Sequence, residues 1–171
     1  DKILRQVLSR DSNNAIALHN LGISLARRGL ATEAAGLTER AIALRPGRAD
    51  MMSTHAYALQ LKGQFDAAIA LYRQAVARDP LYIAAHENLS RLLWSLGKHE
   101  SFIADLDTAI ARHPSAVALL LTKGNLLGHA ERFADARETF ARVLKVMPDE
   151  PTAHDGFARM SAELGDAKQA I

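Results

Sequence analysis

The chain has 171 residues, of which 49% are hydrophobic and 5% aromatic, and it contains no cysteine, which excludes disulfides and thiolate metal sites. Its 21 cationic and 19 anionic side chains are interspersed, and the longest basic run is Arg27-Arg28, so the clustered charge of a nucleic-acid surface is absent. No apolar run reaches the roughly 18 residues of a transmembrane helix, so we expect no membrane partner. The lack of cysteine fits a reducing compartment, and we expect a cytoplasmic protein.

Residues 1–14 predict one helix and its closing turn, because Ile3, Leu4, Val7 and Leu8 have helical spacing. In the repeat described next, this segment corresponds to the second helix and turn of a truncated repeat. Such a helix has an exposed face, so self-association through the truncated end helices is one expectation. Because the pattern is cut at both ends, we expect the chain to be a fragment of a larger protein.

The rest of the chain repeats one pattern. Pro46, Pro80, Pro114 and Pro148 each lie 34 residues from the next, and a period of this length indicates stacked supersecondary units. The predicted units are repeat 1 (15–48), repeat 2 (49–82), repeat 3 (83–116), repeat 4 (117–150) and a partial repeat 5 (151–171).

Each repeat predicts a helix, a short turn, a second helix and a second turn. In repeat 1, Leu18, Leu21 and Leu25 mark the inner face of the first helix. Gly29 lies where a helix ends in a left-handed residue, and Pro46 ends the second helix. The eighth residue of every repeat is small: Gly22, Ala56, Ser90, Gly124 and Ala158.

Two positions depart from the pattern. Phe102 occupies the place that alanine has in repeats 1, 2 and 4, so we expect the two helices of repeat 3 to be splayed or shifted there. Glu131 stands where the other repeats have glycine, which predicts a turn that is less tight or strained. In repeat 5, a second helix is expected to start at 167–171.

The pattern resembles the tetratricopeptide repeat (TPR): large-x-x-Leu-Gly-x-x-large, followed by alanine, an aromatic residue, alanine and proline. Repeats 1, 2 and 4 match it most fully, and the period covers essentially the whole chain. The resemblance implies an all-α, right-handed superhelical solenoid of antiparallel helix pairs. It also implies that the first helices line a concave groove.

The helical period identifies the stripe of each first helix that avoids the core, which includes Ile23, Arg27 and Ser53. The sixth residues of the repeats form a partial ladder of short polar side chains. An asparagine in such a ladder can pair with a peptide amide through both its donor and its acceptor, and the ladder is similar to the asparagine ladder of O-linked N-acetylglucosamine transferases. The predicted peptide-binding groove consists of His19, Asn20, Thr54, Tyr57, Asn88, Arg91, Trp94, Thr122, Asn125 and Arg159.

Several of these residues have a second interpretation. Trp94 and Tyr57 either anchor peptide side chains or pack on a neighbouring first helix. Arg91 and Arg159 either bind a carboxylate or are solvated or paired with the acidic residue four positions upstream. The carboxylate clamp known in the family is not expected, because His19, Ile23 and Ala84 stand where its polar and cationic groups would be.

No catalytic or metal motif is found. The seven histidines lack the helical spacing of a zinc site. We expect His55, His86 and His154 to be packed and hydrogen-bonded on semi-buried faces, and His19 and His129 to face the groove and make it pH-sensitive. Nucleophile elbows, glycine-rich phosphate loops and carboxylate pairs are absent, so we expect no enzyme activity and no cofactor.

The sequence thus predicts a non-catalytic protein–protein interaction scaffold that binds an extended peptide or a partner helix in its concave groove. The alternative is the substrate-recruiting repeat arm of a larger enzyme, glycosyltransferase- or oxygenase-like, whose catalytic domain lies outside this chain.

Overall fold

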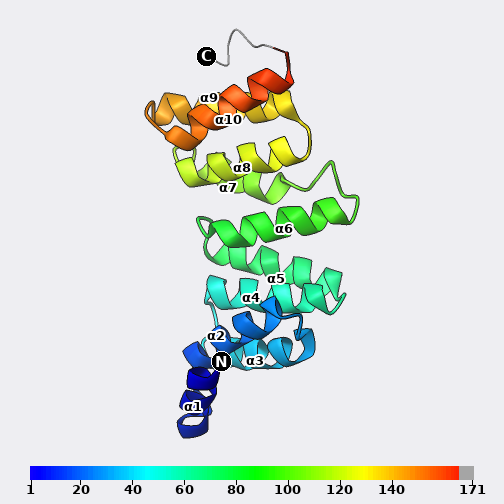
Figure 1. The fold of residues 1–171 in the computed structure, drawn as a ribbon, viewed down its shortest axis with the longest axis vertical. Helices are drawn as coiled ribbons and strands as arrows, with labels where there is room; N and C mark the ends of the chain where they lie inside the picture. The colour runs from blue at the N-terminus through cyan, green and yellow to red at the C-terminus, as the bar shows by residue number, and fades with distance from the viewer. Residues whose placement is uncertain (166–171) are drawn as a thin grey trace. The chain divides into compact units, whose positions relative to one another are not determined.

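The computed structural model describes residues 1–165 of the chain. These residues form ten α-helices and no strand (Figure 1), which confirms the predicted all-α fold of helix pairs. The predicted helix start at 167–171 lies outside the described residues. The helices are α1 (Lys2–Arg10), α2 (Ala15–Arg27), α3 (Ala31–Leu44), α4 (Ala49–Leu61), α5 (Phe65–Arg78), α6 (Ile83–Ser95), α7 (Ala104–Arg112), α8 (Val117–His129), α9 (Phe133–Val146) and α10 (Pro151–Glu163).

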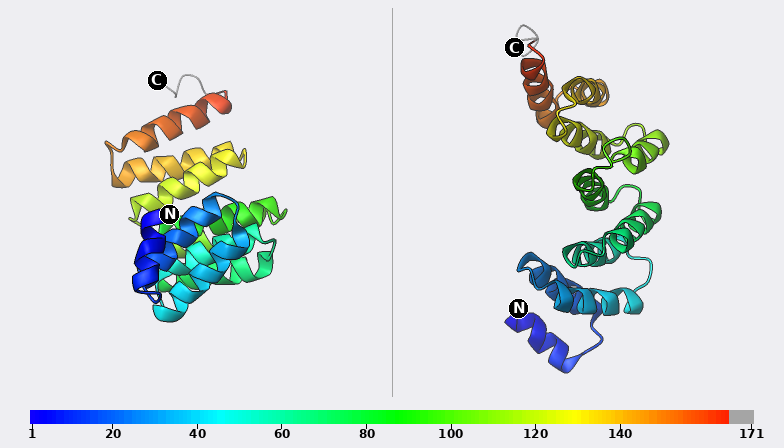
Figure 2. Two further views of the ribbon diagram at one scale, coloured as in Figure 1. Left: turned by 60° about the horizontal axis from the view of Figure 1, so that its bottom comes forward. Right: turned by 90° about the vertical axis from the view of Figure 1, so that its right-hand side faces the viewer.

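The chain divides into two compact units, the first comprising Asp1–Leu96 with α1–α6 and the second beginning at Gly97 with α7–α10. Within each unit the helices stack in chain order (Figure 2). In the first unit α2 packs on α3 and α4 on α5, and the first helices are neighbours, because α4 packs against both α2 and α6. In the second unit α9 packs against α8 and α10. None of the described helices has the length and apolar character needed to cross a membrane.

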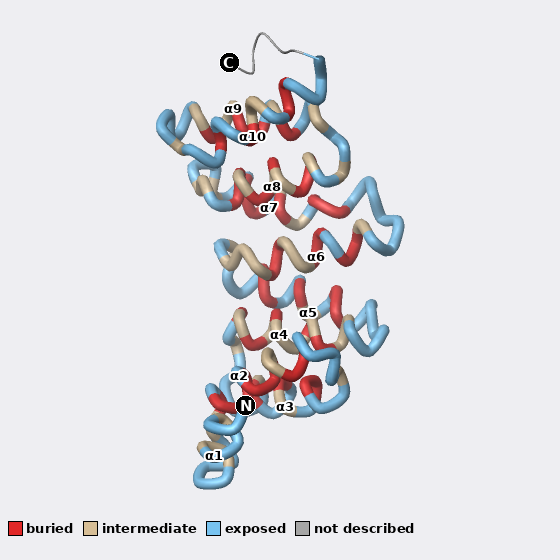
Figure 3. The backbone as a smooth tube through the Cα atoms, in the orientation of Figure 1, coloured by how far each residue is buried: buried red, intermediate tan, exposed pale blue. Residues whose placement is uncertain are grey.

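Small and branched apolar side chains form the core between the helices. The predicted inner face of α2 is confirmed, since Leu18, Leu21 and Leu25 are fully buried. Figure 3 shows how buried and exposed residues alternate along α2–α10, as expected for helices that pack on one face. Burial of each such leucine stabilises the fold by about 1.5–3 kcal/mol.

The turns inside the repeats share one geometry. Gly29 has φ 76°, and the amide of Leu30 donates to the carbonyl of Leu25 over 3.0 Å. Glu131 has φ 58°, and the amide of Arg132 donates to the carbonyl of Leu127 over 2.9 Å. The turn at Glu131 is therefore as tight as the glycine turns, and the residue adopts a left-handed conformation that glycine accepts without a steric penalty.

Glu131→Gly is expected to raise the free energy of unfolding by about 1 kcal/mol, because it relieves this conformation. Urea unfolding followed by circular dichroism measures the change. The matched control is Glu138→Gly at an exposed position inside α9, which should lower stability by about 1 kcal/mol. A Glu131→Gly variant no more stable than the parent would show that the turn is unstrained.

The second helix of repeat 3 begins late. α3, α5 and α9 each have 14 residues, whereas α7 has 9 and starts at Ala104. Phe102 lies just before it and is buried. An aromatic ring does not fit where alanine allows close helix contact, so the helix starts beyond it. The second helix of repeat 3 is therefore shortened at its start, next to Phe102.

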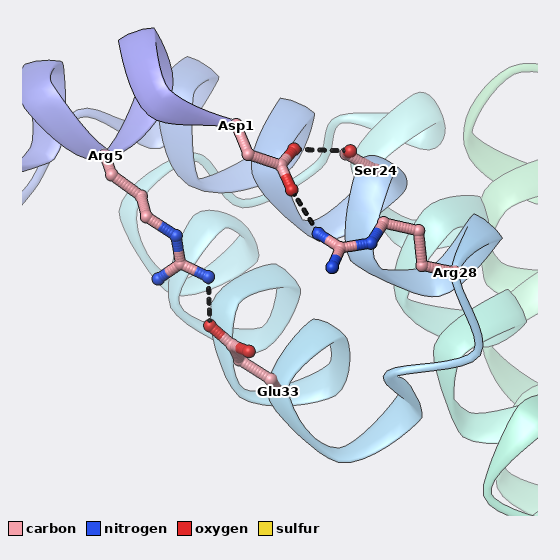
Figure 4. A network of polar contacts seen from close by, with 5 residues as sticks. All are labelled: Asp1, Arg5, Ser24, Arg28 and Glu33. Atoms are coloured by element: carbon pink, nitrogen blue, oxygen red, sulfur yellow. Dashed lines mark hydrogen bonds and ion pairs between the residues drawn. The ribbon is translucent and has the colours of Figure 1, made fainter.

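Polar contacts link α1 to the next two helices (Figure 4). The carboxylate of Asp1 accepts hydrogen bonds from the hydroxyl of Ser24 and the guanidinium of Arg28, both over 2.5 Å. Arg5 pairs with Glu33 over 2.8 Å. Exposed pairs of this kind contribute only about 0–1 kcal/mol each.

Apolar contacts of α1 add to these ion pairs. Leu4 and Leu8 are half-buried and pack against the core formed by α2 and α3, whereas Ile3 is 76% exposed. One face of α1 is therefore anchored and the other is open to solvent.

Candidate functional site

The first helices of the first unit border an open cavity of about 430 Å³, within the range of about 300–1,000 Å³ that is typical of ligand sites. We call it the groove cavity. It is lined by Ile23, Arg27, Ser53, Thr54, Tyr57, Tyr82, Ala84, Asn88 and Arg91.

Helical spacing brings these side chains together. On α4, Thr54 and Tyr57 are three residues apart, and on α6, Asn88 follows Ala84 by four residues and precedes Arg91 by three. Residues three or four apart share one face of a helix. Each first helix therefore presents one stripe, and the stripes of α2, α4 and α6 meet at the cavity.

The structure brings four of the predicted groove residues together, because Thr54, Tyr57, Asn88 and Arg91 all line the groove cavity. Asn20 lies on α2 with an exposed side chain, outside the lining. The positions of these five residues agree with the stripe that the helical period assigns to the solvent side.

The remaining predicted residues lie elsewhere. Trp94 is half-buried on α6 and does not line the cavity. Asn125 is half-buried on α8 and Arg159 is exposed on α10, both in the second unit.

Two predicted contact residues are buried, which corrects the expectation that they face a ligand. His19 is 9% and Thr122 5% exposed. A first helix packs against its own second helix and against the neighbouring repeats. The buried part of its surface is therefore wider than a single packed face and includes positions that the helical period assigns to the groove.

Sequence reasoning missed Tyr82 and Ala84 as lining residues. Tyr82 precedes the first residue of α6 and lies outside the helical period used to find the stripe. The available signal was an aromatic residue in an inter-repeat turn. Ala84 stands at one of the carboxylate-clamp positions considered in the sequence, but it is not among the predicted groove residues.

The two tyrosines are fixed in place by the core. Tyr57 packs against the buried cluster that includes Leu21 and Leu25, and Tyr82 packs against the cluster that includes Ala75. Burial, together with nearby acidic residues, raises the pKa of Tyr82, so its hydroxyl stays protonated and can donate a hydrogen bond. Both rings offer an apolar face and a polar end to a ligand.

Further polar groups complete the cavity. The hydroxyl of Thr54 donates to the carbonyl of Asp50 over 3.0 Å, which leaves its oxygen free to accept. Asn88 offers both a donor and an acceptor. Arg27 and Arg91 are exposed, and within residues 1–165 neither forms an ion pair, so Arg91 is solvated and not paired with the acidic residue upstream.

A second cavity of about 420 Å³ shares Tyr82 with the groove cavity. Its cations are engaged by the protein: Arg48 binds the carboxylate of Asp50 over 2.9 and 2.6 Å, and Arg78 donates to the carbonyl of Gly47 over 3.1 Å. The hydrogen bond from Arg48 lowers the pKa of Asp50. This cavity therefore has less capacity for a charged ligand.

Three histidines make hydrogen bonds, as expected. Nδ1 of His55 lies 2.9 Å from the hydroxyl of Thr38. Nε2 of His86 and of His154 donate to the proline carbonyls that close the preceding repeats, over 3.0 and 2.7 Å. His55 is semi-buried as predicted, whereas His86 is buried and His154 is exposed. In the described part of the chain, no three metal-ligating side chains form a group.

Stability should fall as the pH drops below 6.5, because burial lowers the pKa values of His19 and His55 from that ordinary value. The folded state therefore favours the neutral form of both imidazole rings. Their contribution is complete above pH 6.5 and is lost as the pH falls through their folded-state pKa values.

Urea midpoints between about pH 8 and about pH 5 measure this loss. The double variant His19→Gln/His55→Gln should show a flatter profile than the parent. If the parent and the double variant lost stability equally as the pH falls, the pH dependence could not be assigned to His19 and His55.

Comparison with known proteins supports a repeat array. The chain is 34% identical over 94 residues to the inactive TPR repeat-containing thioredoxin TTL3 of Arabidopsis thaliana, which is 55% of this chain and 14% of that protein. It is 31% identical over 88 residues to DnaJ homolog subfamily C member 3 of Rattus norvegicus, covering 52% of this chain and 18% of that protein. The chain thus spans a small part of the length of these relatives.

Solved structures share the fold. The pilF structure from Pseudomonas aeruginosa is similar with a TM-score of 0.63 and 21% identity, covering 95% of this chain and 73% of that chain. YrrB, described as a TPR protein with an unusual peptide-binding site, is similar with a TM-score of 0.57 and 15% identity, covering 98% and 87%.

The family profile of the tetratricopeptide repeat matches residues 2–49, 54–117 and 121–171. These matches cover nearly the whole chain, and together with the relatives they indicate a protein–protein interaction scaffold. The chain belongs to the tetratricopeptide-repeat family.

Proposed function

We propose that the groove cavity binds an extended peptide segment of a partner protein. The observation that carries this proposal is the meeting of Thr54, Tyr57 and Asn88 in one cavity lined by three consecutive first helices. An extended segment has unpaired backbone amides that need partners, and Asn88 and the free lone pairs of Thr54 supply them.

A partner helix fits this cavity less well. A helix satisfies its own backbone hydrogen bonds and docks through an apolar face. Most side chains that line the groove cavity carry a polar group, and Ile23 and Ala84 are the purely apolar ones. The polar lining favours an extended chain.

The rigid setting of the tyrosines supports binding. Tyr57 is held against the core of the first unit, so a peptide side chain that packs on its ring meets a preformed surface. Preorganisation reduces the ordering cost of binding, and aromatic anchors are frequent binding hot spots. The peptide-binding site named for YrrB supports the same use of this fold.

A second candidate function is a recruiting arm within a longer protein. The chain spans 14% of the length of the plant thioredoxin relative, so repeats of this kind occur beside other domains. The groove would then bind the substrate protein, and the chemistry would lie in another domain of the full-length protein. The complete reading frame around this chain tests this candidate directly.

Selection of peptides from a random library on the immobilised chain tests the proposed function. Selected peptides are titrated against the parent protein, Tyr57→Ala, Asn88→Ala and the control Gln74→Ala on the exposed outer side of α5. We expect a loss of more than about tenfold in affinity for Tyr57→Ala. Asn88→Ala should lose about threefold to tenfold, and Gln74→Ala none.

Unchanged affinity in both groove variants would refute the placement of the site. A selection that yields no binding peptide would count against peptide binding altogether. Tyr57 and Asn88 are half-buried and Gln74 is exposed, and circular dichroism checks that each variant folds.

A further inference from the structure

Two unpaired arginines line a cavity that contains no acidic side chain. Arg27 of α2 and Arg91 of α6 are exposed and contribute to the groove cavity. Neither has an ion pair anywhere in residues 1–165, and none of the lining residues is aspartate or glutamate. The cavity therefore has positive charge that the described protein does not neutralise, and charge complementarity points to an anionic ligand.

Nearby acidic residues leave this charge uncompensated. The carboxylate of Asp50 is already bound by Arg48 through two hydrogen bonds, over 2.9 and 2.6 Å. Glu87 lies four residues before Arg91 on α6, but no salt bridge joins the two within the described part of the chain. Arg27 and Arg91 thus remain available to a ligand.

The positions of the two arginines indicate what kind of anion fits. α2 and α6 each pack against α4, so Arg27 and Arg91 approach the cavity from different helices with α4 between them. Axes of packed helices are about 8–10 Å apart, which places the axes of α2 and α6 up to about 16–20 Å apart. Because the two cations come from separate helices and both line the cavity, a ligand with two anionic groups can pair one group with each arginine.

We propose that the groove cavity selects an extended peptide with two internal acidic side chains. One carboxylate pairs with Arg27 and the other with Arg91, and the segment between them packs on Tyr57. An extended chain in the polyproline II conformation has three residues per turn and rises about 3.1 Å per residue, so two acids three residues apart lie on the same side of the chain, about 9 Å apart, within reach of the long arginine side chains. This proposal rests on the peptide-binding function above and specifies the class of its ligand.

The test uses the full chain and synthetic dodecapeptide pools that are acetylated and amidated at their ends. One pool has a central Glu-x-x-Glu, a second has Gln-x-x-Gln, and a third has Gln-x-x-Gln with a free C-terminal carboxylate. Fluorescence polarisation of labelled pools measures binding. We expect the Glu pool to bind about tenfold more tightly than either Gln pool, because each charge-assisted pair exceeds a neutral hydrogen bond.

Three variants assign the preference to the cavity. Arg27→Gln and Arg91→Gln should each remove most of the Glu preference. The control Arg45→Gln makes the same charge change at an exposed position after α3, outside the groove cavity. This variant should retain the preference for the Glu pool. High salt should weaken the parent's preference for the Glu pool and leave binding of the Gln pool nearly unchanged.

The outcomes separate the two proposals. Equal binding of the Glu and Gln pools, still weakened by Tyr57→Ala, overturns the acidic pair and leaves the peptide groove standing. A free-carboxylate pool that binds as tightly as the Glu pool also overturns it, since a chain end would then be the ligand. If no pool binds above background, both proposals fail.

Discussion

Phe140→Ala is expected to lower the free energy of unfolding by about 3–5 kcal/mol. Phe140 is fully buried in α9, between two helices that approach it through glycines. A Cβ added at Gly124 of α8 would lie 2.8 Å from the ring, and one added at Gly156 of α10 would lie 2.6 Å from it. The ring therefore fills space that these glycines leave, and its removal creates a cavity lined on both sides.

Chemical unfolding of the variant measures this loss, with Phe65→Ala as the control. Phe65 is 41% exposed at the start of α5, so its removal should cost much less. Equal losses for the two variants would contradict the account of the α8–α9–α10 core.

The second large effect is expected at Gly22, where Gly22→Ala should destabilise the first unit by about 1–3 kcal/mol. The added Cβ would lie 2.4 Å from Cγ2 of Thr38. Thr38 is buried, and its hydroxyl donates to the carbonyl of Ala34 over 2.8 Å and lies 2.9 Å from Nδ1 of His55. Relief of the clash therefore disturbs these hydrogen bonds or separates α2 from α3.

Gly36→Ala is the matched control for this prediction. Gly36 lies in the middle of α3, and a Cβ added there meets no atom within 4 Å. Because alanine favours the helical conformation more than glycine does, the free energy of unfolding of this variant should rise by about 0.5–1 kcal/mol. Thermal unfolding compares the two variants. If their unfolding temperatures shifted in the same direction, the close contact at Gly22 would be contradicted.

Much of the fold could be predicted from the sequence because every repeat uses the same local pattern of buried residues and helix-ending turns. Leucines such as Leu18, Leu93 and Leu120 are buried on the first helices, and Gly29 and its equivalents follow the ends of these helices. Contacts within a repeat array are mainly between neighbours, so a pattern 34 residues long contains most of the information needed. The late start of α7 could be inferred only as a local disturbance, from the size of Phe102.

The site was less predictable, because it depends on how three helices pack together. The helical period predicts Thr54, Tyr57, Asn88 and Arg91 on the solvent-facing stripe, and these residues line the groove cavity together. The helical period alone does not say how wide the buried face of a helix is. It therefore predicts His19 on the groove side, although this residue is buried.

Side chains in turns and the relations between charges were also beyond the sequence pattern. Tyr82 enters the cavity from an inter-repeat turn, where no period applies. That Arg27 and Arg91 line one cavity while Arg48 neutralises Asp50 follows only from the packed structure.

Nuclear magnetic resonance mapping of a bound library-selected peptide tests the groove most directly, since the chain of 18.6 kDa suits backbone assignment. The account predicts that the largest amide shift changes cluster on the α2, α4 and α6 residues around the groove cavity, with Tyr57 and Asn88 among them. Changes concentrated on the exposed sides of α3 and α5, with these residues unaffected, would contradict it.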